Sequence, residues 1–285
     1  MTTAELAGRT CVVTGATSGI GFETARGVLQ RGARLVMVAR SRSKASAAVA
    51  ALGVTIPSPD VTVVLGDLAV QADVRRVANE ILACCPQIHV LVNNAGVVNL
   101  ERRLTVDGIE ETLAVNHLAY YLLTRLLLDR LTASAPARIV NVASDAHRFG
   151  RVDLDDLNSA QRYGAMRVYG MSKGCNILFT YELARRLADT GVTVNCCHPG
   201  AVRTSLGHNN GGLASRLAGM VGVFFRTPAQ GALTSIRLAT APELAAVTGH
   251  YFANEKPKRS ARATYDMHVQ RRLWDESARL TGLPA

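Results

Sequence analysis

Short apolar runs alternate with longer segments of helical periodicity through most of the chain. Each short run of aliphatic and β-branched residues predicts a strand, and each longer segment repeats its apolar residues every three to four positions, as one face of a helix does. The predicted strands cover residues 10–14, 34–39, 61–65, 88–92, 137–142, 192–197 and 250–253. The predicted helices cover 22–31, 42–52, 71–84, 105–131, 168–191, 228–239 and 262–280.

This alternation predicts an α/β protein. Strands that are apolar at nearly every position are buried on both faces, which is typical of a doubly wound, mostly parallel sheet of about seven strands covered by helices on both faces. No break in composition indicates a second domain, so residues 1–285 are expected to form one. Residues 203–226 begin polar and glycine-rich and then turn apolar, which indicates either a lid over a pocket or a variable connection. Residues 262–285 are expected to be a C-terminal helix or tail.

Residues with functional chemistry follow the ends of five predicted strands. They are Gly15, Asp67, Asn93, Ser144 and Pro199. Ligands of open parallel sheets bind beyond the carboxyl ends of the strands, so these residues are expected to meet at one ligand site.

A glycine-rich turn joins the first strand to the first helix, with Gly15, Gly19 and Gly21 in a G-x-x-x-G-x-G spacing. Glycines at this place let backbone amides approach a pyrophosphate, whose charge the helix N-terminus favours. A plain turn is the competing interpretation. The position at a strand-to-helix junction favours a dinucleotide.

Tyr169 and Lys173 stand four residues apart in a predicted helix and therefore project from the same face. A nearby ammonium favours the phenolate and is expected to lower the pKa of the phenol from about 10. Such a phenol can exchange a proton with a carbonyl or alcohol oxygen. A chance pair in an amphipathic helix is the alternative, and the surrounding motifs decide between the two.

The end of the second predicted strand indicates which dinucleotide binds. NAD-binding proteins usually place an acid there for the ribose 2′-hydroxyl, whereas this chain has Ala39-Arg40-Ser41-Arg42. Arg40 and Arg42 could pair with a 2′-phosphate, so NADP is expected rather than NAD. Surface arginines at a helix start are the competing interpretation.

Composition narrows the function further. The formal net charge is +10, but the arginines occur as singles and pairs, so nucleic-acid binding is not expected. No signal peptide or membrane span is apparent, and the six cysteines fall mostly in apolar patterns without metal-site spacing. These features favour a cytoplasmic protein with reduced thiols and no metal. The Arg- and Ala-rich composition suggests a bacterium of high GC content.

Six motifs in order resemble the short-chain dehydrogenases/reductases over residues 8–260. They are Thr14-Gly15-x-x-x-Gly19-x-Gly21, Asn93-Asn94-Ala95-Gly96, Asn116, Ser144, Tyr169-x-x-x-Lys173 and Pro199-Gly200. Residues 140–147 and 172–179 most resemble the retinol-dehydrogenase-like branch. The resemblance implies a Rossmann fold. Ala143 stands where the family usually has the first of two serines, and a membrane anchor like that of several animal relatives is not expected.

The resemblance also implies residue roles. Tyr169 would be the general acid/base, Lys173 would assist it and bind the nicotinamide ribose, Ser144 would bind the substrate oxygen, and Asn116 would bend its helix and hold a relay water. A local helical hydrogen bond is the alternative for Asn116, a strand-end cap for Ser144 and a helix N-cap for Asp67. The residues implied to bind the cofactor are Gly15, Thr17, Ser18, Gly19, Ile20, Gly21, Arg40, Arg42, Asp67, Leu68, Asn93, Ala95, Gly96, Tyr169, Lys173, Pro199, Gly200, Val202 and Thr204.

Together these features predict an NADP(H)-dependent oxidoreductase that interconverts a carbonyl and an alcohol on a bulky apolar molecule. Reduction of a carbon–carbon double bond, epimerisation and non-catalytic NADPH binding stay open. His147 and His198 adjoin turns, where a histidine is more often structural than catalytic. Many relatives form homodimers through helices near 105–131 and 165–190 and other branches are monomeric, so the resemblance leaves the oligomeric state open.

Overall fold

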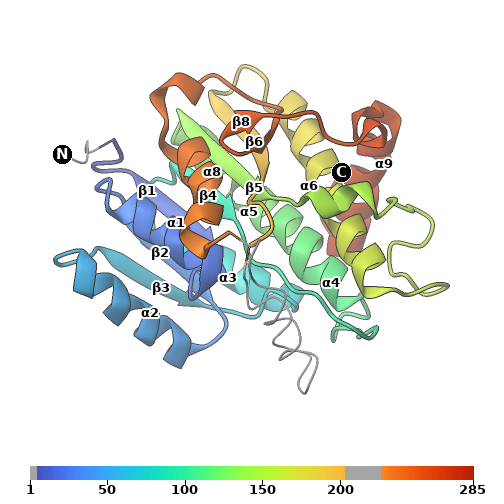
Figure 1. Ribbon diagram of the computed structural model, residues 1–285, viewed down its shortest axis with the longest axis horizontal. Helices are drawn as coiled ribbons and strands as arrows, with labels where there is room; N and C mark the ends of the chain where they lie inside the picture. The colour runs from blue at the N-terminus through green and yellow to red at the C-terminus, as the bar shows by residue number, and fades with distance from the viewer. Residues whose placement is uncertain (1–4, 203–225) are drawn as a thin grey trace.

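A computed structural model describes residues 5–202 and 226–285. Within these ranges the chain forms an eight-stranded sheet with the order β3-β2-β1-β4-β5-β6-β7-β8 (Figure 1). The strands are β1 Thr10–Thr14, β2 Arg34–Ala39, β3 Val61–Leu65, β4 Val90–Asn93, β5 Ala137–Val142, β6 Val192–His198, β7 Tyr251–Ala253 and β8 Lys256–Pro257. Neighbouring strands from β3 through β7 are parallel, and β8 pairs antiparallel with β7. The predicted parallel α/β sheet is confirmed, with one short antiparallel strand added at its edge.

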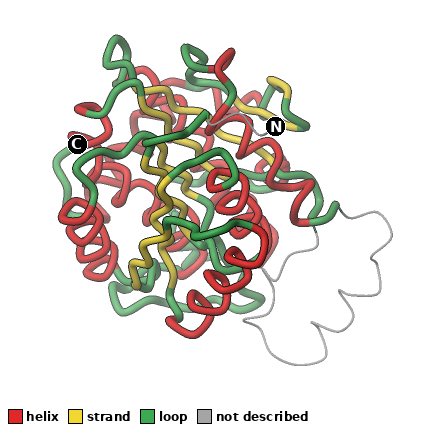
Figure 2. Tube along the Cα trace, turned by 90° about the vertical axis from the view of Figure 1, so that its left-hand side faces the viewer, coloured by secondary structure: helices red, strands yellow, loops and turns green. Residues whose placement is uncertain are grey.

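Helices cover both faces of the sheet, which Figure 2 shows as a twisted column of strands between helices. The α-helices are α1 Gly19–Leu29, α2 Arg42–Thr55, α3 Gln71–Cys84, α4 Glu111–Leu113, α5 Ala119–Ala133, α6 Ala165–Arg186, α8 Pro228–Thr240 and α9 Met267–Thr281. A π-helical turn, Ala114–Leu118, joins α4 to α5, and 3-10 turns cover Asp145–Arg148, Pro242–Leu244 and Arg262–Tyr265.

The alternation of side chains along each strand divides the core into two layers. In β1, Val12 packs with α3, α5, α6 and α9 on one face of the sheet. Its neighbours Cys11 and Val13 pack with α1, α2 and α8 on the other face. Every inner strand is therefore apolar at both odd and even positions, which is why the sequence shows unbroken apolar runs instead of an alternating pattern.

The predicted helix over residues 105–131 differs most from the structure. Residues 105–109 form a turn in which Gly108 has φ +73° and the Thr105 hydroxyl accepts hydrogen bonds from the amides of Asp107 and Ile109. The Glu110 carboxylate then accepts from the amides of Thr112 and Leu113, so the helix begins at Glu111. The helical periodicity of the apolar residues concealed a polar turn and a cap.

The C-terminal segment forms a true helix, α9, which packs in the groove between α5 and α6. Trp274 of α9 stacks on Phe179 with ring centroids 6.0 Å apart and meets the Tyr121 ring edge-on at 5.1 Å. The guanidinium of Arg186 lies 4.0 Å from the Trp274 ring centroid. Because α9 covers the outer face of α5 and α6 here, a homodimer that used this face would have to displace it.

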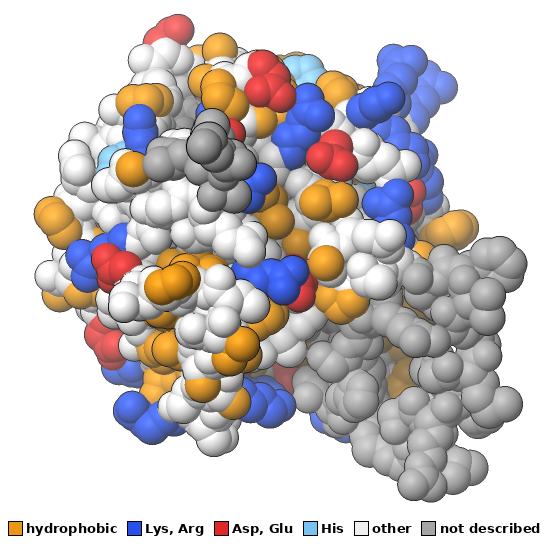
Figure 3. All heavy atoms as spheres, turned by 60° about the vertical axis from the view of Figure 1, so that its left-hand side comes forward, with side chains coloured by type: hydrophobic (Ala, Val, Ile, Leu, Met, Phe, Trp, Pro, Cys, Tyr) orange, Lys and Arg blue, Asp and Glu red, His pale blue; other side chains and the backbone are white. Residues whose placement is uncertain are grey.

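The side of the molecule drawn in Figure 3 mixes basic, acidic and neutral side chains. In the view of Figure 3, Lys and Arg side chains gather toward the upper right edge and otherwise lie in small groups beside acidic and neutral side chains. The six cysteines are free thiols, and all but Cys84 are buried. Among the described residues, no helix combines the length and apolarity that a membrane crossing requires. The predicted lid, residues 203–226, lies outside the described residues except for Arg226.

We predict that Trp274→Ala destabilises the fold by about 3–5 kcal/mol, because it removes a large buried side chain and leaves a cavity between α5, α6 and α9. Trp274→Phe should cost less than about 2 kcal/mol, since the Trp274 ring nitrogen has no hydrogen-bond partner among the described residues. Urea denaturation followed by circular dichroism measures both values. Equal losses of unfolding free energy in the two variants would contradict a role of the Trp274 ring in filling the space between α5, α6 and α9.

Candidate active site

The sheet has its topological switch point between β1 and β4, where the strand order reverses direction and opens a crevice at the carboxyl ends. A cavity of about 310 Å³ lies there. It is lined by Gly15, Thr17, Ser18, Gly19, Ile20, Gly21, Val38, Ala39, Arg40, Ser41, Lys44, Gly66, Asp67, Leu68, Asn94, Ala95, Gly96, Val97, Val115, Val142, Ala143, Tyr169, Lys173 and Pro199. Residues from six strand ends therefore meet at one elongated site, as predicted for parallel strands.

Hydrogen bonds between the ends of β1 and β4 fix the middle of this site. The Thr14 hydroxyl accepts from the backbone amides of Asn94 (2.9 Å) and Ala95 (3.1 Å). The Asn94 side chain donates in return to the Thr14 carbonyl at 2.9 Å. Asn94 thus joins the two strands, a role that its position in the Asn93-Asn94-Ala95-Gly96 motif could have indicated.

The glycine-rich turn places an uncapped helix end against the cavity. Ser18 is the N-cap of α1 and its side chain accepts no capping hydrogen bond, so the first amides of the helix are open to a ligand. Gly19 has φ +56° with open space in front of its Cα, and a side chain on Gly21 would overlap the Gly15 carbonyl and Asn94. These features fit a pyrophosphate, which accepts from backbone amides at close range.

Cationic side chains line the cavity where β2 ends. Arg40 and Lys44 are both in its wall, whereas Arg42, which the sequence had suggested, is not. The two wall residues are separated by one turn of chain at the start of α2, and Ser41 between them caps that helix by accepting from the Lys44 amide. The sequence predicted Arg40 and Arg42 as the cations at this end, whereas the structure places Arg40 and Lys44 in the cavity wall, and Lys44 was not predicted.

Asp67 lies in the cavity wall at the end of β3. Its carboxylate accepts from the Ala69 amide at 3.0 Å and lies 3.8 Å from Arg40. The alternative of a helix N-cap is wrong, because α3 begins after Val70. Asp67 instead stabilises the turn that precedes α3 and pairs with a cation at the β2 end.

Lys173 is almost fully buried beneath the opposite end of the cavity, with 2% of its surface exposed. Its Nζ donates to the Val142 carbonyl at 3.0 Å and lies 5.7 Å from the centroid of the Tyr169 ring. Burial lowers the pKa of Lys173 to about 7. The ammonium is therefore placed where another oxygen acceptor would stabilise its charge.

Tyr169 lies one helical turn before Lys173, in the cavity wall. Burial raises the pKa of Tyr169 above the ordinary phenol value, and a hydrogen bond with the Ser144 hydroxyl lowers it in part. The prediction that the ammonium lowers this pKa is not met in the structure, because Lys173 faces the ring and donates to Val142 instead. The protonated phenol is the form that this environment favours.

Ser144 follows β5, with its hydroxyl close to Tyr169 and accepting from the Ala146 amide at 3.2 Å. It therefore also caps the 3-10 turn Asp145–Arg148, so the strand-end cap considered as an alternative is present as well. A hydroxyl that accepts one hydrogen bond still has its own proton to donate.

Asn116 lies in the π-helical turn and makes no local helical bond through its side chain. Its Oδ1 accepts from the Val97 amide at 2.8 Å, and its Nδ2 donates to the Val97 carbonyl at 3.0 Å and to the Ser172 hydroxyl at 3.1 Å. Asn116 thus connects the loop after β4 to the helix of Tyr169, and the widened turn is where its helix departs from α geometry.

Asn93 is a correction to the predicted site. Its side chain is fully buried in the sheet, where Nδ2 donates to Thr124 and Asn141 at 2.9 Å each, so the side chain points away from the cavity. Pro199 lines the cavity, and Gly200 follows it with φ +89°. Val202 packs on Gly231 beside the cavity, and Thr204 lies outside the described residues.

The family model of short chain dehydrogenases matches residues 9–211. Human retinol dehydrogenase 14 is 43% identical over 292 residues, which is 97% of this chain and 87% of that protein. Human retinol dehydrogenase 13 is 42% identical over 288 residues, with 99% of this chain and 87% of that protein covered.

Solved structures give the same result. An uncharacterized protein from Mycobacterium Paratuberculosis superimposes with a TM-score of 0.80 at 33% identity, covering 98% of this chain and 96% of that one. The complex of Pseudomonas aeruginosa RhlG with NADP has a TM-score of 0.70 at 27% identity, covering 89% and 97%. The chain therefore belongs to the short chain dehydrogenase family, whose members are oxidoreductases that use a nicotinamide dinucleotide.

Proposed function

We propose that this protein uses NADP(H) to interconvert a carbonyl and an alcohol on a bulky, largely apolar small molecule. The main support is that Tyr169 and Lys173 stand together at one end of a cavity whose middle fits a pyrophosphate and whose other end is cationic. In this arrangement the bound dinucleotide would supply or accept a hydride.

Tyr169 and the residues around it would transfer the proton that the reaction requires. In reduction the phenol gives its proton to the carbonyl oxygen, and the Ser144 hydroxyl donates a hydrogen bond to the same oxygen as negative charge develops there. Lys173 would turn its ammonium toward a ribose hydroxyl and toward the phenolate that forms. Its Nζ now donates to the Val142 carbonyl and lies 5.7 Å from the centroid of the Tyr169 ring.

Two cations support NADP over NAD. Arg40 and Lys44 line the cavity at the end of β2, where a ribose 2′-phosphate would extend, and no Asp or Glu of that strand end opposes it. Asp67 already pairs with Arg40, so its charge is partly neutralised. A guanidinium can bind a phosphate through two hydrogen bonds, and an ammonium adds a further positive charge.

Apolar side chains near the catalytic end support the substrate class. Val97 and Val115 line the cavity, and Leu100, Leu104 and Phe149 are exposed in the segments that follow β4 and β5 in the chain, Phe149 to 80%. Apolar side chains in a cavity wall favour an apolar ligand. The names of the human relatives point to alcohols of the retinol type, which are bulky and apolar.

A panel of bulky ketones, aldehydes, enones and alcohols, followed at the absorbance of reduced nicotinamide, tests the activity directly. We predict turnover with carbonyls and NADPH, and a loss of at least about a hundredfold in kcat for Tyr169→Phe, because the proton donor is removed. Tyr121→Phe is the matched control, since its hydroxyl bonds Arg125 away from the cavity. Full turnover by Tyr169→Phe, or product formed only from enones, would reject carbonyl reduction.

The direction of the Tyr169 shift predicts opposite pH profiles for the two reactions. A raised pKa keeps the phenol protonated at neutral pH, which suits reduction, whereas alcohol oxidation needs the phenolate that forms as pH rises. The rate of oxidation should therefore increase steadily from neutral pH to about 10, while reduction holds level and then declines over the same range. Values of kcat/KM in both directions across this range measure the effect. An oxidation rate that falls with rising pH would contradict the assignment of Tyr169 as the base.

The cofactor preference can be tested with three single substitutions. We predict that Arg40→Ala and Lys44→Ala each reduce the preference for NADPH over NADH by about tenfold, or about 1.4 kcal/mol. Arg42→Ala removes the same kind of charge outside the cavity and should leave the preference unchanged. Dissociation constants for both dinucleotides, measured by nicotinamide fluorescence, give the ratio. An effect at Arg42 as large as at Lys44 would show that overall charge, not a phosphate contact, sets the preference.

A further inference from the structure

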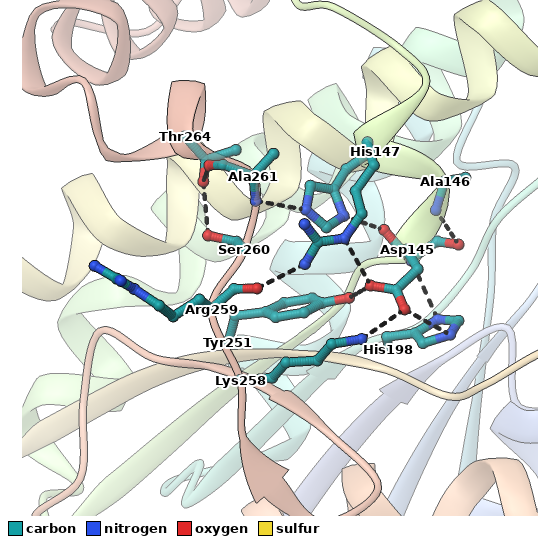
Figure 4. A network of polar contacts seen from close by, with 12 residues as sticks. Asp145, Ala146, His147, His198, Tyr251, Lys258, Arg259, Ser260, Ala261 and Thr264 are labelled. Carbon is teal, nitrogen blue, oxygen red and sulfur yellow. Dashed lines mark hydrogen bonds and ion pairs between the residues drawn. The ribbon is translucent and has the colours of Figure 1, made fainter.

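A polar network surrounds the residue after Ser144 (Figure 4). The Asp145 carboxylate accepts from the Tyr251 hydroxyl at 2.8 Å and from the Lys258 ammonium at 3.0 Å. Burial would raise the pKa of Asp145, but the bonds from Tyr251 and Lys258 lower it to about 2, so the group is a carboxylate. The network thereby holds the 3-10 turn after β5 against β7 and the segment that follows β8.

The peptide unit between Ser144 and Asp145 is held at both of its polar atoms. Its carbonyl accepts from His147 Nδ1 at 2.6 Å, and its amide donates to His198 Nδ1 at 3.2 Å. His147 accepts from the Ala261 amide through Nε2, so its ring is anchored by the C-terminal segment. Two histidines from different elements therefore fix the backbone directly after Ser144.

The His198 contact joins two turns that both reach the cavity. Regular sheet pairing between β5 and β6 ends at Val142 and Cys197, and the Ala143 amide still donates to the Cys197 carbonyl at 2.8 Å. Beyond that point the contact between Asp145 and His198 continues the connection through a side chain. Ser144 directly precedes Asp145, and Pro199 directly follows His198.

We propose that His198, anchored by Asp145, is a positioning residue that sets the spacing between the Ser144 turn and the Pro199 turn. The inference rests on the proposed function, in which Ser144 binds the substrate oxygen, and it further assigns the nicotinamide to the part of the cavity that Pro199 lines. A fixed spacing between these turns keeps the carbonyl in line for hydride and proton transfer, where small displacements cost rate.

The contact requires a neutral imidazole with its lone pair on Nδ1, since that atom accepts a hydrogen bond. Burial lowers the pKa of His198, and the Asp145 carboxylate raises it in part. The other charged or titratable groups that act on this ring, among the described residues, are Lys258, Arg226 and His147. The contact is therefore intact at neutral pH and is lost as the pH falls through the His198 pKa.

Two substitutions at His198 separate positioning from a merely structural role. The Oδ1 of an asparagine side chain lies nearly where imidazole Nδ1 does, so His198→Asn keeps the acceptor and removes the titration. His198→Ala removes both. His250→Ala is the control, because that histidine is exposed and its ring hydrogen-bonds the Thr248 carbonyl of its own segment. Each variant is measured for NADPH dissociation constant, kcat on the best carbonyl and kcat as a function of pH.

We expect His198→Ala to lower kcat about tenfold with the NADPH dissociation constant within about twofold of wild type. His198→Asn should stay within about threefold in kcat and lose the acid limb that wild type shows on the acid side of the ordinary histidine range. Wild-type kcat in His198→Ala, an acid limb retained in His198→Asn, or equal losses in both variants would overturn the proposal. If the alanine variant does not fold, the pH profile of the asparagine variant still decides.

Wild type without turnover on any carbonyl would reject the proposed function and this inference together, whereas turnover that depends on Tyr169 but not on His198 rejects this inference alone.

Discussion

The crevice between β1 and β4 exists because neighbouring parallel strands there send their connections to opposite faces of the sheet. Nothing in the regular pairing closes the gap above the strand ends, so its width depends on side chains. The side chains of Thr14 and Asn94 make five hydrogen bonds across it, all with backbone groups. The glycines that flank them keep the space open, since a Cβ on Gly15 would lie 2.8 Å from the Ala95 Cα. The site is therefore narrow and rigid in its middle. The cationic side chains lie at one end of it, and Tyr169 and Lys173 lie at the other.

The catalytic end is defined by an ammonium in an apolar interior. Lys173 has one hydrogen-bond acceptor, Val142, among the described residues, and two aromatic rings near its Nζ. Burial of a charge with so few partners is costly, which the depressed pKa of about 7 reflects. A ligand hydroxyl or a phenolate at this place would stabilise the charged form. Under the proposed function, ligand binding and the protonation of Lys173 would therefore be coupled, and the pKa of Tyr169 would fall when both are in place.

The sequence predicted the fold well because parallel, buried strands leave apolar runs that periodicity detects. Most of the residues predicted at the strand ends lie in the wall of one cavity, since motifs at strand ends meet at one edge of a parallel sheet. Errors arose where the direction of a side chain decides the role. Asn93 and Asn94 are adjacent in one motif, and only the pleat of β4 tells which faces the cavity. Arg42 and Lys44 both begin α2, and only the rotation of the helix selects Lys44.

Tertiary contacts also explain what composition could not show about the C-terminal segment. Its polar-rich sequence is consistent with a tail, yet Ser277 lies 2.9 Å from His117 Nε2, and His117 Nδ1 lies 3.3 Å from Asn176 Oδ1. Asn176 donates to the same Val142 carbonyl that Lys173 uses. A continuous line of buried polar contacts therefore runs from α9 through the core to α6, the helix that carries Tyr169 and Lys173. Because unpaired buried polar groups are costly, this line fixes how α6 is rotated about its axis, and with it the direction in which Tyr169 and Lys173 project. The helix most distant from the cavity in sequence thus contributes to the geometry of the site without reaching it.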